Sequence, residues 1–198
     1  MSHYYTNDDT PHEYQRVTHE FKGKTYVFKT DRGVFSKDAV DYGSNFLIET
    51  VIEDVEEPTD FIDMGSGYGP IAIILADSFK TVPLMVDVNE DAMAVSRENL
   101  EMNQIVGEVM NRSDYDLSDK KTTLYVTNPP FRVGKKIVME ILSDGFERLK
   151  ENGSFYMVVQ KKQGMPSYKK ELDRLFGNVE VVKKDKGYYI LKAIKESK

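Results

Sequence analysis

Three short segments of the sequence hold residues whose types and spacing could bind a ligand or perform chemistry. The first is DMGSGYG, residues 63–69, whose glycines at positions 65, 67 and 69 allow a tight turn and a close backbone approach to a ligand. Asp87 follows Gly67 by 20 residues, about the offset at which a second-strand carboxylate meets ribose hydroxyls in nucleoside-binding folds. Taken alone, the glycines could also form a purely structural turn.

The spacing of these glycines distinguishes between two kinds of nucleoside ligand. It is G-x-G-x-G rather than the G-x-G-x-x-G of dinucleotide-binding folds, and Asp63 lies two residues before the first glycine. A carboxylate at that position would face the cationic end of a ligand and not a pyrophosphate. This favours S-adenosylmethionine, whose ammonium and sulfonium groups are positive. A second segment, RSDYD at residues 112–116, places Asp114 where it could accept a hydrogen bond from adenine, although Ser113 and Asp114 could equally form a turn or a helix cap.

The third segment, VTNPPF at residues 126–131, ends an apolar run on an amide, two prolines and an aromatic ring. Proline lacks an N–H and fixes its own φ, so the segment suits neither a helix interior nor a central strand. At the carboxyl edge of a parallel sheet, the Asn128 side-chain oxygen and a loop carbonyl could accept both N–H groups of an exocyclic amine. Phe131 offers a face for stacking on a planar base or amide. In isolation the tetrapeptide could be only a rigid turn, but beside the glycine loop we favour the amine site.

The elements that must position these segments alternate between strand and helix. Strands are predicted over residues 60–64, 82–88, 107–110, 122–127 and 153–160, and helices over residues 38–55, 69–79, 90–103, 135–149 and 167–176. Two closing strands, 179–184 and 187–193, predict an antiparallel pair at the C-terminus, and residues 19–30 predict a small N-terminal β-hairpin around Lys22-Gly23. The pattern predicts an α/β fold, a doubly wound Rossmann-like sheet with helices on both faces. We divide the chain into a lead-in and hairpin, 1–34, and a main domain, 35–198.

Composition excludes several classes of protein. The 198 residues are 40% hydrophobic and 30% charged, as in one globular domain, and contain no cysteine, which excludes disulfides, thiolate zinc sites and a thiol nucleophile. The three histidines, at positions 3, 12 and 19, all lie near the N-terminus. We therefore expect them to be exposed residues of a lead-in segment and not a buried base or a metal cluster. There is no run of 18 apolar residues and no signal-peptide pattern, so we expect a cytoplasmic protein with no membrane association and no metal.

The net charge of −6 conceals an uneven distribution along the chain. Residues 1–119 are strongly acidic, whereas residues 120–198 are basic. Such an asymmetry permits a polyanionic partner on one face, although it is equally compatible with an ordinary solvated surface.

These residues, in this order, resemble the class I S-adenosylmethionine-dependent methyltransferases, and more closely the RsmC-type guanine-N2 methyltransferases of small-subunit ribosomal RNA. The segments that carry the resemblance are GVFSKDAVDYGSNFLIE, DMGSGYGPIAI, VTNPPFRVGKK, VVQKKQG and GYYILKA. It extends from about residue 20 to the C-terminus. Longer members of that family carry a second, degenerate copy of the domain at the N-terminus, where this chain has the hairpin, so the exact substrate stays open.

The resemblance implies a cofactor, a reaction and a set of site residues. S-adenosylmethionine would be the methyl donor, S-adenosylhomocysteine the product, and ribosomal RNA or the small ribosomal subunit the partner; the oligomeric state stays open. The expected catalytic residues are Asn128, Pro129, Pro130 and Phe131. The expected cofactor-binding residues are Asp63, Gly65, Ser66, Gly67, Gly69, Asp87, Val88, Asp114 and Asn128. The expected substrate-binding residues are Phe35, Ser36, Phe131, Lys135 and Lys162, with Lys136 and Lys161 beside them, although each lysine alone could be a solvated surface charge.

Other interpretations remain open at this point. Adenine N6 of nucleic acid or a protein glutamine amide would fit the same amine site. A nicotinamide-dependent oxidoreductase would share the strand–helix pattern, but the glycine spacing and the lack of a candidate hydride-site histidine disfavour it. A non-catalytic S-adenosylmethionine-binding RNA module would have no need for amine acceptors at residues 128–131.

Overall fold

The computed structural model describes residues 12–31 and 40–197. The strands are β1 (Tyr14–Phe21), β2 (Lys24–Asp31), β3 (Phe61–Met64), β4 (Pro83–Asp87), β5 (Glu108–Asn111), β6 (Thr122–Thr127), β7 (Leu149–Gln160), β8 (Glu180–Asp185) and β9 (Tyr188–Ile194). The α-helices are α1 (Tyr42–Asp54), α2 (Pro70–Phe79), α3 (Glu90–Met102), α4 (Arg112–Leu117), α5 (Lys135–Arg148) and α6 (Met165–Phe176). Two short 3₁₀ turns, η2 (Phe131–Val133) and η3 (Lys161–Gln163), follow β6 and β7.

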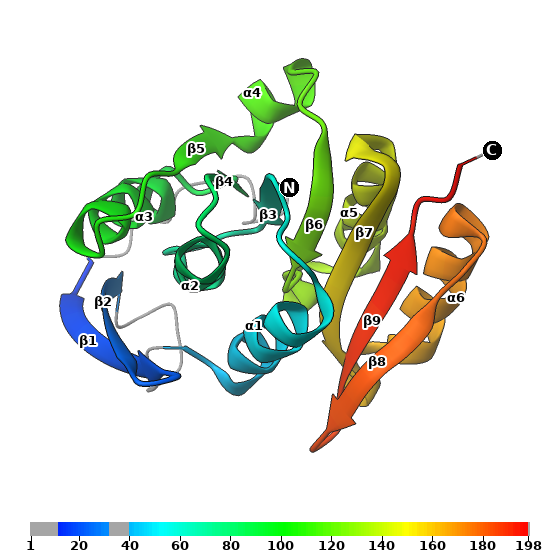
Figure 1. Cartoon of the computed structure of the whole chain (residues 1–198), viewed down its shortest axis with the longest axis horizontal. Coiled ribbons are helices and arrows are strands. Elements are labelled where there is room, and N and C mark those ends of the chain that lie inside the picture. Colours follow the sequence, from blue (N-terminus) through cyan, green and yellow to red (C-terminus); the bar gives the residue numbers. More distant parts are fainter. Residues whose placement is uncertain (1–11, 32–39, 198) are drawn as a thin grey trace.

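The central sheet has the strand order β5-β4-β3-β6-β7-β9-β8 (Figure 1). All neighbouring pairs from β5 to β7 are parallel, whereas β9 is antiparallel to both β7 and β8. The order reverses direction between β3 and β6, which are adjacent although α2, β4, α3, β5 and α4 separate them in the sequence. In open α/β sheets ligands bind outside the carboxyl ends of the strands at such a reversal. The predicted Rossmann-like fold with an antiparallel C-terminal strand is confirmed.

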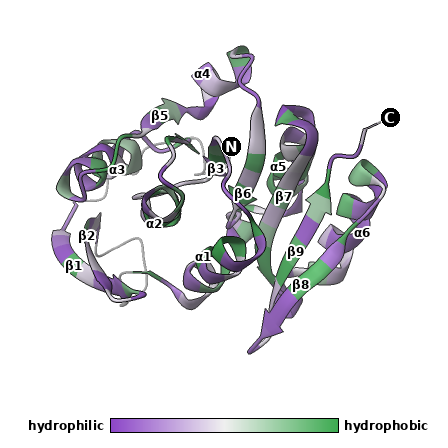
Figure 2. Ribbon diagram, in the orientation of Figure 1, coloured by the Kyte–Doolittle hydropathy of each residue, from purple (hydrophilic) through white to green (hydrophobic). Residues whose placement is uncertain are grey.

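The two faces of the sheet are covered by different helices, because successive residues of a strand point to opposite faces. Phe61 belongs to a buried cluster shared with α1, α2, α3 and the β1–β2 hairpin, whereas the next residue, Ile62, belongs to a cluster shared with α4, α5 and α6. Figure 1 shows α1 and α2 on one side of the central strands and α5 on the other. Figure 2 shows hydrophobic residues on the strands and on the helix sides that meet them, with hydrophilic residues dominating β1.

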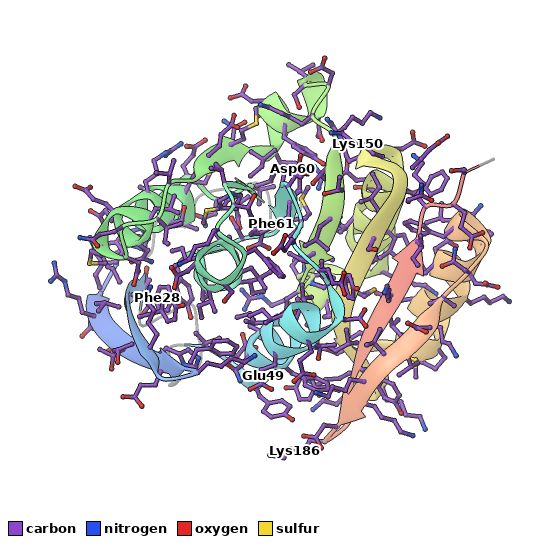
Figure 3. All side chains as sticks on the ribbon, viewed as in Figure 1. Phe28, Glu49, Asp60, Phe61, Lys150 and Lys186 are labelled. Atoms are coloured by element: carbon purple, nitrogen blue, oxygen red, sulfur yellow. The ribbon has the colours of Figure 1, made fainter. Side chains whose placement is uncertain are left out.

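The β1–β2 hairpin packs against the layer of helices α1, α2 and α3, which also covers one face of the main sheet. Phe28 is fully buried, its ring lies 6.0 Å from that of Tyr68 in the glycine loop, and Figure 3 shows it pointing inward from β2. Lys22 and Gly23 adopt positive φ of 47° and 80°, as in the tight turns that suit a twisted hairpin. The predicted hairpin is confirmed, and the division of the chain at residue 34 stays a prediction.

Asn99 of α3 and Asn103, the residue that caps the C-terminus of this helix, form hydrogen bonds with the edge of β2 that a neighbouring strand would otherwise form. The Asn103 side chain accepts from the Val27 N–H at 3.0 Å and donates to the Val27 carbonyl at 2.7 Å. Asn99 does the same with Lys29, at 2.7 and 3.0 Å, and also donates to the Tyr68 carbonyl at 2.7 Å. Their spacing of four residues places both amides on one helix face. The hairpin edge is thus hydrogen-bonded, and it is linked through Asn99 to the glycine loop.

Capping side chains set the starts of three helices, α1, α3 and α4. Asp41, Asn89 and Asn111 accept the backbone N–H three residues on, at 2.8, 3.0 and 2.8 Å, and so begin α1, α3 and α4. The first helix begins later than predicted, because Asp41 caps it and Tyr42 is its first residue; positions 38 and 39 of the predicted helix lie outside the described residues. The helix α4 was not predicted as an element, and β7 begins four residues earlier than the predicted 153.

The two histidines within the described residues, His12 and His19, both form side-chain contacts, unlike residues of a loose lead-in. His12 is exposed, but its ring contacts the carboxylates of Asp31 and Asp91 at 2.5 and 2.9 Å, and these contacts raise its pKa. His19 bonds to the Asn45 side chain at 3.0 Å, and His3 lies outside the described residues. Within residues 12–31 and 40–197, no group of three His, Cys, Asp or Glu side chains could hold a metal ion. In the same part of the chain, no helix is long and apolar enough to cross a bilayer.

Candidate active site

The glycine loop between β3 and α2 is built on a backbone that favours glycine. Gly65, Gly67 and Gly69 have φ of 77°, 56° and 105°, all in the left-handed region. The N–H groups of Gly65 and Ser66 donate to the Val86 carbonyl at 2.8 and 3.0 Å, which ties the loop to the end of β4. At Gly69 an added Cβ would also lie 2.8 Å from the Met85 side chain. The loop therefore turns tightly over the carboxyl ends of β3 and β4, and Pro70 begins α2 directly behind it.

Asp87 organises the same edge from the end of β4. Its Oδ2 accepts the Gly67 N–H at 2.7 Å, and its Oδ1 accepts the N–H groups of Val88 and Asn89 at 2.8 and 3.0 Å. Burial raises the pKa of Asp87, and these three backbone donors act in the opposite direction. A carboxylate has about four acceptor positions, so capacity remains for a ligand hydroxyl. The structure thus brings two predicted residues, Gly67 and Asp87, into direct contact across 20 residues of sequence.

Asp63 and Ser66 carry buried polar atoms that lack partners. Asp63, in β3, is fully buried, and neither of its carboxylate oxygens has a hydrogen-bond partner among the described residues; the same holds for the Ser66 hydroxyl. Burial and, to a smaller extent, the nearby Asp87 carboxylate together raise the pKa of Asp63 to about 7, although the backbone N–H of Ala72 acts in the opposite direction. Buried polar groups are nearly always satisfied, so these atoms are candidates for hydrogen bonds to a ligand. A cation-bearing ligand fits this acceptor set, because it would favour the ionised form of Asp63.

The end of β6 lies beside the glycine loop. Thr127 pairs with Met64 in the parallel ladder, and its hydroxyl donates to the Met64 carbonyl at 2.8 Å. Asn128 follows immediately, half-buried, and its side-chain nitrogen donates to the Ser44 hydroxyl at 3.0 Å. The amide oxygen of Asn128 takes no part in that contact and remains available as an acceptor. Asn128 therefore lies one strand away from Asp63, where an acceptor could face a ligand in the glycine loop.

The prolines and the ring after Asn128 form a compact turn. The Pro129 carbonyl accepts the Phe131 N–H at 3.0 Å, and the Pro130 carbonyl accepts the Val133 N–H at 3.0 Å. The Pro129 carbonyl is the candidate for the loop carbonyl that would face a target amine, and since a carbonyl has two lone pairs, this contact leaves one available. Phe131, in η2, is half-buried with its ring 5.6 Å from that of Tyr168 in α6.

A cavity of about 230 Å³ opens next to Asn128, on the side of β7 and β9. Besides Asn128, its lining residues include Asp41, Gly43, Val158, Gln160, Gln163 and Tyr188. Gln160 and Gln163 bond to each other around η3, with the Gln160 N–H donating to Gln163 Oε1 at 2.9 Å. The cavity thus combines a carboxylate, three amides and a phenol at the carboxyl edge of the sheet, a mixture of donors and acceptors suited to a polar planar group.

The other predicted residues lie around this centre at different depths. Val88 follows Asp87 and is half-buried, whereas Asp114 is exposed in the first turn of α4, with its N–H capped by Asn111. The lysines Lys135, Lys136, Lys161 and Lys162 are all exposed, at the start of α5 and in η3. Phe35 and Ser36 lie outside the described residues.

Sequence reasoning missed Asp41 and Ser44. Both lie at the start of α1, where the spacing Asp-x-x-Ser signals a helix cap, and nothing in the sequence indicates that the Ser44 hydroxyl contacts a residue 84 positions away. The Asn99 contact with the Tyr68 carbonyl was missed for the same reason.

Comparisons with known proteins point to one family. The chain matches the family model of the methyltransferase small domain over residues 25–192. The uncharacterized protein YbxB of Bacillus subtilis (strain 168) is 46% identical over 170 residues, which cover 84% of each chain. The ribosomal RNA small subunit methyltransferase C of Buchnera aphidicola is 30% identical over 166 residues, 81% of this chain and 48% of that protein. The chain thus spans about half the length of that relative.

Solved structures agree with this pattern. The T. thermophilus 16S rRNA N2 methyltransferase RsmC, in complex with AdoMet and guanosine, superimposes with a TM-score of 0.83 at 25% identity. The match covers 96% of this chain and 52% of that one. A ribosomal protein L11 methylase from Lactobacillus delbrueckii subsp. bulgaricus has a TM-score of 0.68 at 20% identity, which indicates the shared fold alone.

Proposed function

Because the chain belongs to the methyltransferase small-domain family and is an S-adenosylmethionine-dependent methyltransferase, we propose that it methylates an exocyclic amine, N2 of guanine in small-subunit ribosomal RNA. The observation that carries the proposal is the position of Asn128 beside the glycine loop, one strand away from Asp63. The guanine target is supported by the likeness to an RsmC enzyme in complex with guanosine. The family assignment removes the oxidoreductase alternative.

The cofactor is S-adenosylmethionine, which supplies an activated methyl group on its sulfonium. In our proposal Asp63, Ser66 and the loop glycines hold its methionine part, and Asp87 holds its ribose through one hydroxyl. The unpartnered oxygens of Asp63 and the unpartnered Ser66 hydroxyl suit this assignment, because an ammonium group is a donor that favours the ionised carboxylate. Val88 and Asp114 would border the adenine.

The chain's own part in the reaction is to place the amine. The Asn128 oxygen and the free lone pair of the Pro129 carbonyl accept the two N–H groups, so that the nitrogen lone pair is directed at the methyl carbon. The N–C bond forms as the C–S bond breaks, S-adenosylhomocysteine leaves, and a proton passes from the methylated amine to water. Both hydrogen bonds strengthen as positive charge develops on nitrogen, which stabilises the transition state more than the bound substrate. Phe131 would stack on the base.

The raised pKa of Asp63 predicts that cofactor binding depends on pH. The folded-state pKa of about 7 exceeds the ordinary 3.8, so in the free protein Asp63 becomes ionised only as the pH rises through 7. Binding of the ammonium group needs the ionised form. We therefore expect the affinity for S-adenosylhomocysteine to fall about tenfold between pH 8 and pH 6, by linkage to one proton. Isothermal titration calorimetry across this range checks it.

The matched variant for that titration is Asp63→Asn. It removes the titrating group while Asp87, the other acidic group nearby with a raised pKa, stays in place. We expect weaker binding of S-adenosylhomocysteine and a flat pH profile in this variant. If the affinity of Asp63→Asn for S-adenosylhomocysteine depended on pH as steeply as that of the wild type, Asp87 and not Asp63 would be the titrating group. That result would contradict the role of Asp63.

The RNA would meet the basic surface beside the site. Lys161 N–H donates to the Gly187 carbonyl at 3.1 Å, so η3 lies next to the β8–β9 turn that carries Lys186. In Figure 3, Lys186 lies at the opposite end of the sheet from Asp60 and Lys150. Lysines at this edge can contact phosphates and release counterions, which makes affinity depend on salt. A ribosomal substrate also implies that the protein acts in the cytoplasm.

Replacing Lys162 with glutamine should weaken RNA binding and reduce its dependence on salt. Because one phosphate contact is lost, the slope of log affinity against log salt concentration should fall by about 0.7 to 0.9. Lys150→Gln is the matched control, since Lys150 is also exposed but lies at the opposite edge, and it should leave the slope unchanged. Filter-binding titrations from 50 to 300 mM salt measure both. If the slope of log affinity against log salt concentration were the same for both variants, Lys162 would not be part of the surface that contacts RNA.

The identity of the target atom can be tested by changing that atom alone. Small-subunit ribosomal RNA transcribed with inosine in place of guanosine keeps every ring but lacks the exocyclic N2 amine. We expect methyl transfer from labelled S-adenosylmethionine to unmodified RNA and no transfer to the inosine-substituted RNA. Equal labelling of both would exclude guanine N2 and favour adenine N6, whereas labelling of neither, with labelling of a ribosomal protein, would favour a protein amide.

A further inference from the structure

A chain of three polar side chains connects the N-terminus of α1 to the amide of Asn128. The Asn128 side-chain nitrogen donates to the Ser44 hydroxyl at 3.0 Å, and that hydroxyl donates to Asp41 Oδ2 at 3.1 Å. The other oxygen of Asp41 accepts the Ser44 backbone N–H at 2.8 Å as the helix cap. Ser44 is only 5% exposed, so solvent contributes little to these contacts. The chain joins two elements that are 84 residues apart in the sequence.

The direction of these hydrogen bonds is fixed by chemistry. A carboxylate only accepts, so the single hydrogen of the Ser44 hydroxyl is directed to Asp41. The side of the hydroxyl that faces Asn128 therefore offers a lone pair, and only the NH₂ end of the amide can satisfy it. The oxygen of Asn128 is left as the free end, beside the cavity described above. The capping carboxylate thus determines which way round the amide of Asn128 is held.

We propose that Ser44, oriented by Asp41, is a positioning residue that holds the Asn128 amide with its oxygen toward the target amine. A flipped amide would present two N–H groups to the N–H groups of the substrate, which repels the amine instead of binding it. The two orientations of an amide have nearly the same shape, so packing alone does not choose between them. The inference rests on the proposed amine methylation for its catalytic consequence, but the orientation itself can be observed without any substrate.

The first test is spectroscopic and uses the protein alone. The side-chain NH₂ resonances of Asn128 are identified in a ¹⁵N-correlation NMR spectrum by their loss in Asn128→Asp. In Ser44→Ala these resonances should shift and exchange faster with water, because the acceptor is removed. Thr50→Val is the matched control: Thr50 is a buried hydroxyl of the same helix that bonds to the Phe46 carbonyl and not to Asn128. Unchanged Asn128 resonances in Ser44→Ala would overturn the proposal, whatever the substrate is.

The second test measures catalysis in a double-mutant cycle. Ser44→Ala should lower kcat about five- to tenfold, with KM for RNA and the affinity for S-adenosylhomocysteine within about twofold of the wild type. In the Asn128→Asp background, Ser44→Ala should lower kcat by less than about twofold, because a carboxylate offers an acceptor whichever way it turns. A merely structural role of Ser44 would cost the same in both backgrounds. Equal losses in the two backgrounds would therefore overturn the proposal.

The two tests separate this inference from the proposed function. If wild-type protein transfers no methyl to RNA, the proposed substrate is wrong, and the NMR comparison of Ser44→Ala with Thr50→Val still decides the orientation of Asn128. If transfer occurs and Ser44→Ala behaves as the wild type in both measurements, the inference is wrong and the proposed function stands. Thermal unfolding of each variant with S-adenosylhomocysteine confirms that the protein is folded in every comparison.

Discussion

Asn128→Ala is expected to lower kcat by about two orders of magnitude or more while the affinity for S-adenosylhomocysteine stays within about twofold of the wild type. The amide oxygen is one of two acceptors assigned to the amine, and its hydrogen bond strengthens only as charge develops on nitrogen. Removing it therefore raises the barrier without removing a cofactor contact from the glycine loop. Single-turnover transfer of labelled methyl measures the chemical step, and calorimetry measures cofactor binding.

The variant Asn128→Asp makes this prediction more specific. It keeps an acceptor of nearly the same size at the end of β6, so its kcat should lie between those of the wild type and Asn128→Ala. Because Asn128 is hydrogen-bonded to Ser44, the thermal unfolding of each variant with bound S-adenosylhomocysteine is the necessary control. Near-normal turnover in a folded Asn128→Ala protein would contradict the role assigned to this residue.

Asp87→Ala is expected to weaken the binding of S-adenosylhomocysteine by about 100-fold or more. A hydrogen bond to a charged acceptor contributes about 1.5 to 3 kcal/mol, a factor of about 10 to 150 in affinity, and the ribose hydroxyl at the remaining acceptor position of Asp87 would lose its bond. The substitution also leaves the Gly67, Val88 and Asn89 N–H groups without their acceptor, which loosens the turn that holds the loop in place. Calorimetric titration with S-adenosylhomocysteine gives the loss directly.

Asp91→Ala is the matched control for Asp87. Asp91 is an acidic residue in the first turn of α3, four positions further on, and its side chain contacts His12 rather than the glycine loop. We expect its affinity for S-adenosylhomocysteine to remain within about twofold of the wild type. A similar loss in both variants would mean that the negative potential of the region matters and not the specific contact at Asp87.

The parts of the fold that the sequence predicts are those with strong local signals. The strand over residues 122–127 and the helices α2, α3, α5 and α6 have clear apolar periodicity or turn residues at their ends, and the structure confirms them within a few residues. The glycine turn was predictable because positive φ at Gly65, Gly67 and Gly69 requires a residue type that the sequence displays. A strand followed by such a turn is a local pattern, so its identification needs no knowledge of the rest of the chain.

The features that could not be predicted from the sequence are a short helix and contacts between distant segments. The helix α4 spans only Arg112–Leu117, too short to show a period, and its cap at Asn111 resembles a turn. The Ser44–Asn128 contact and the bonds from Asn99 and Asn103 to β2 join residues that only the folded sheet brings together. A polar residue on a helix carries no mark of its distant partner, so these links appear only in the structure.

The measurement that tests the central claim most directly is nucleoside mass spectrometry after reaction with S-adenosylmethionine. Unmodified small-subunit ribosomal RNA is offered both naked and assembled into subunits, and Asn128→Ala is run beside the wild type. We predict N2-methylguanosine in the wild-type reaction and about one hundredth of its initial rate of formation, or less, with the variant. Absence of N2-methylguanosine from both RNA forms, in a protein that binds S-adenosylhomocysteine, would contradict the assignment of guanine N2 as the target.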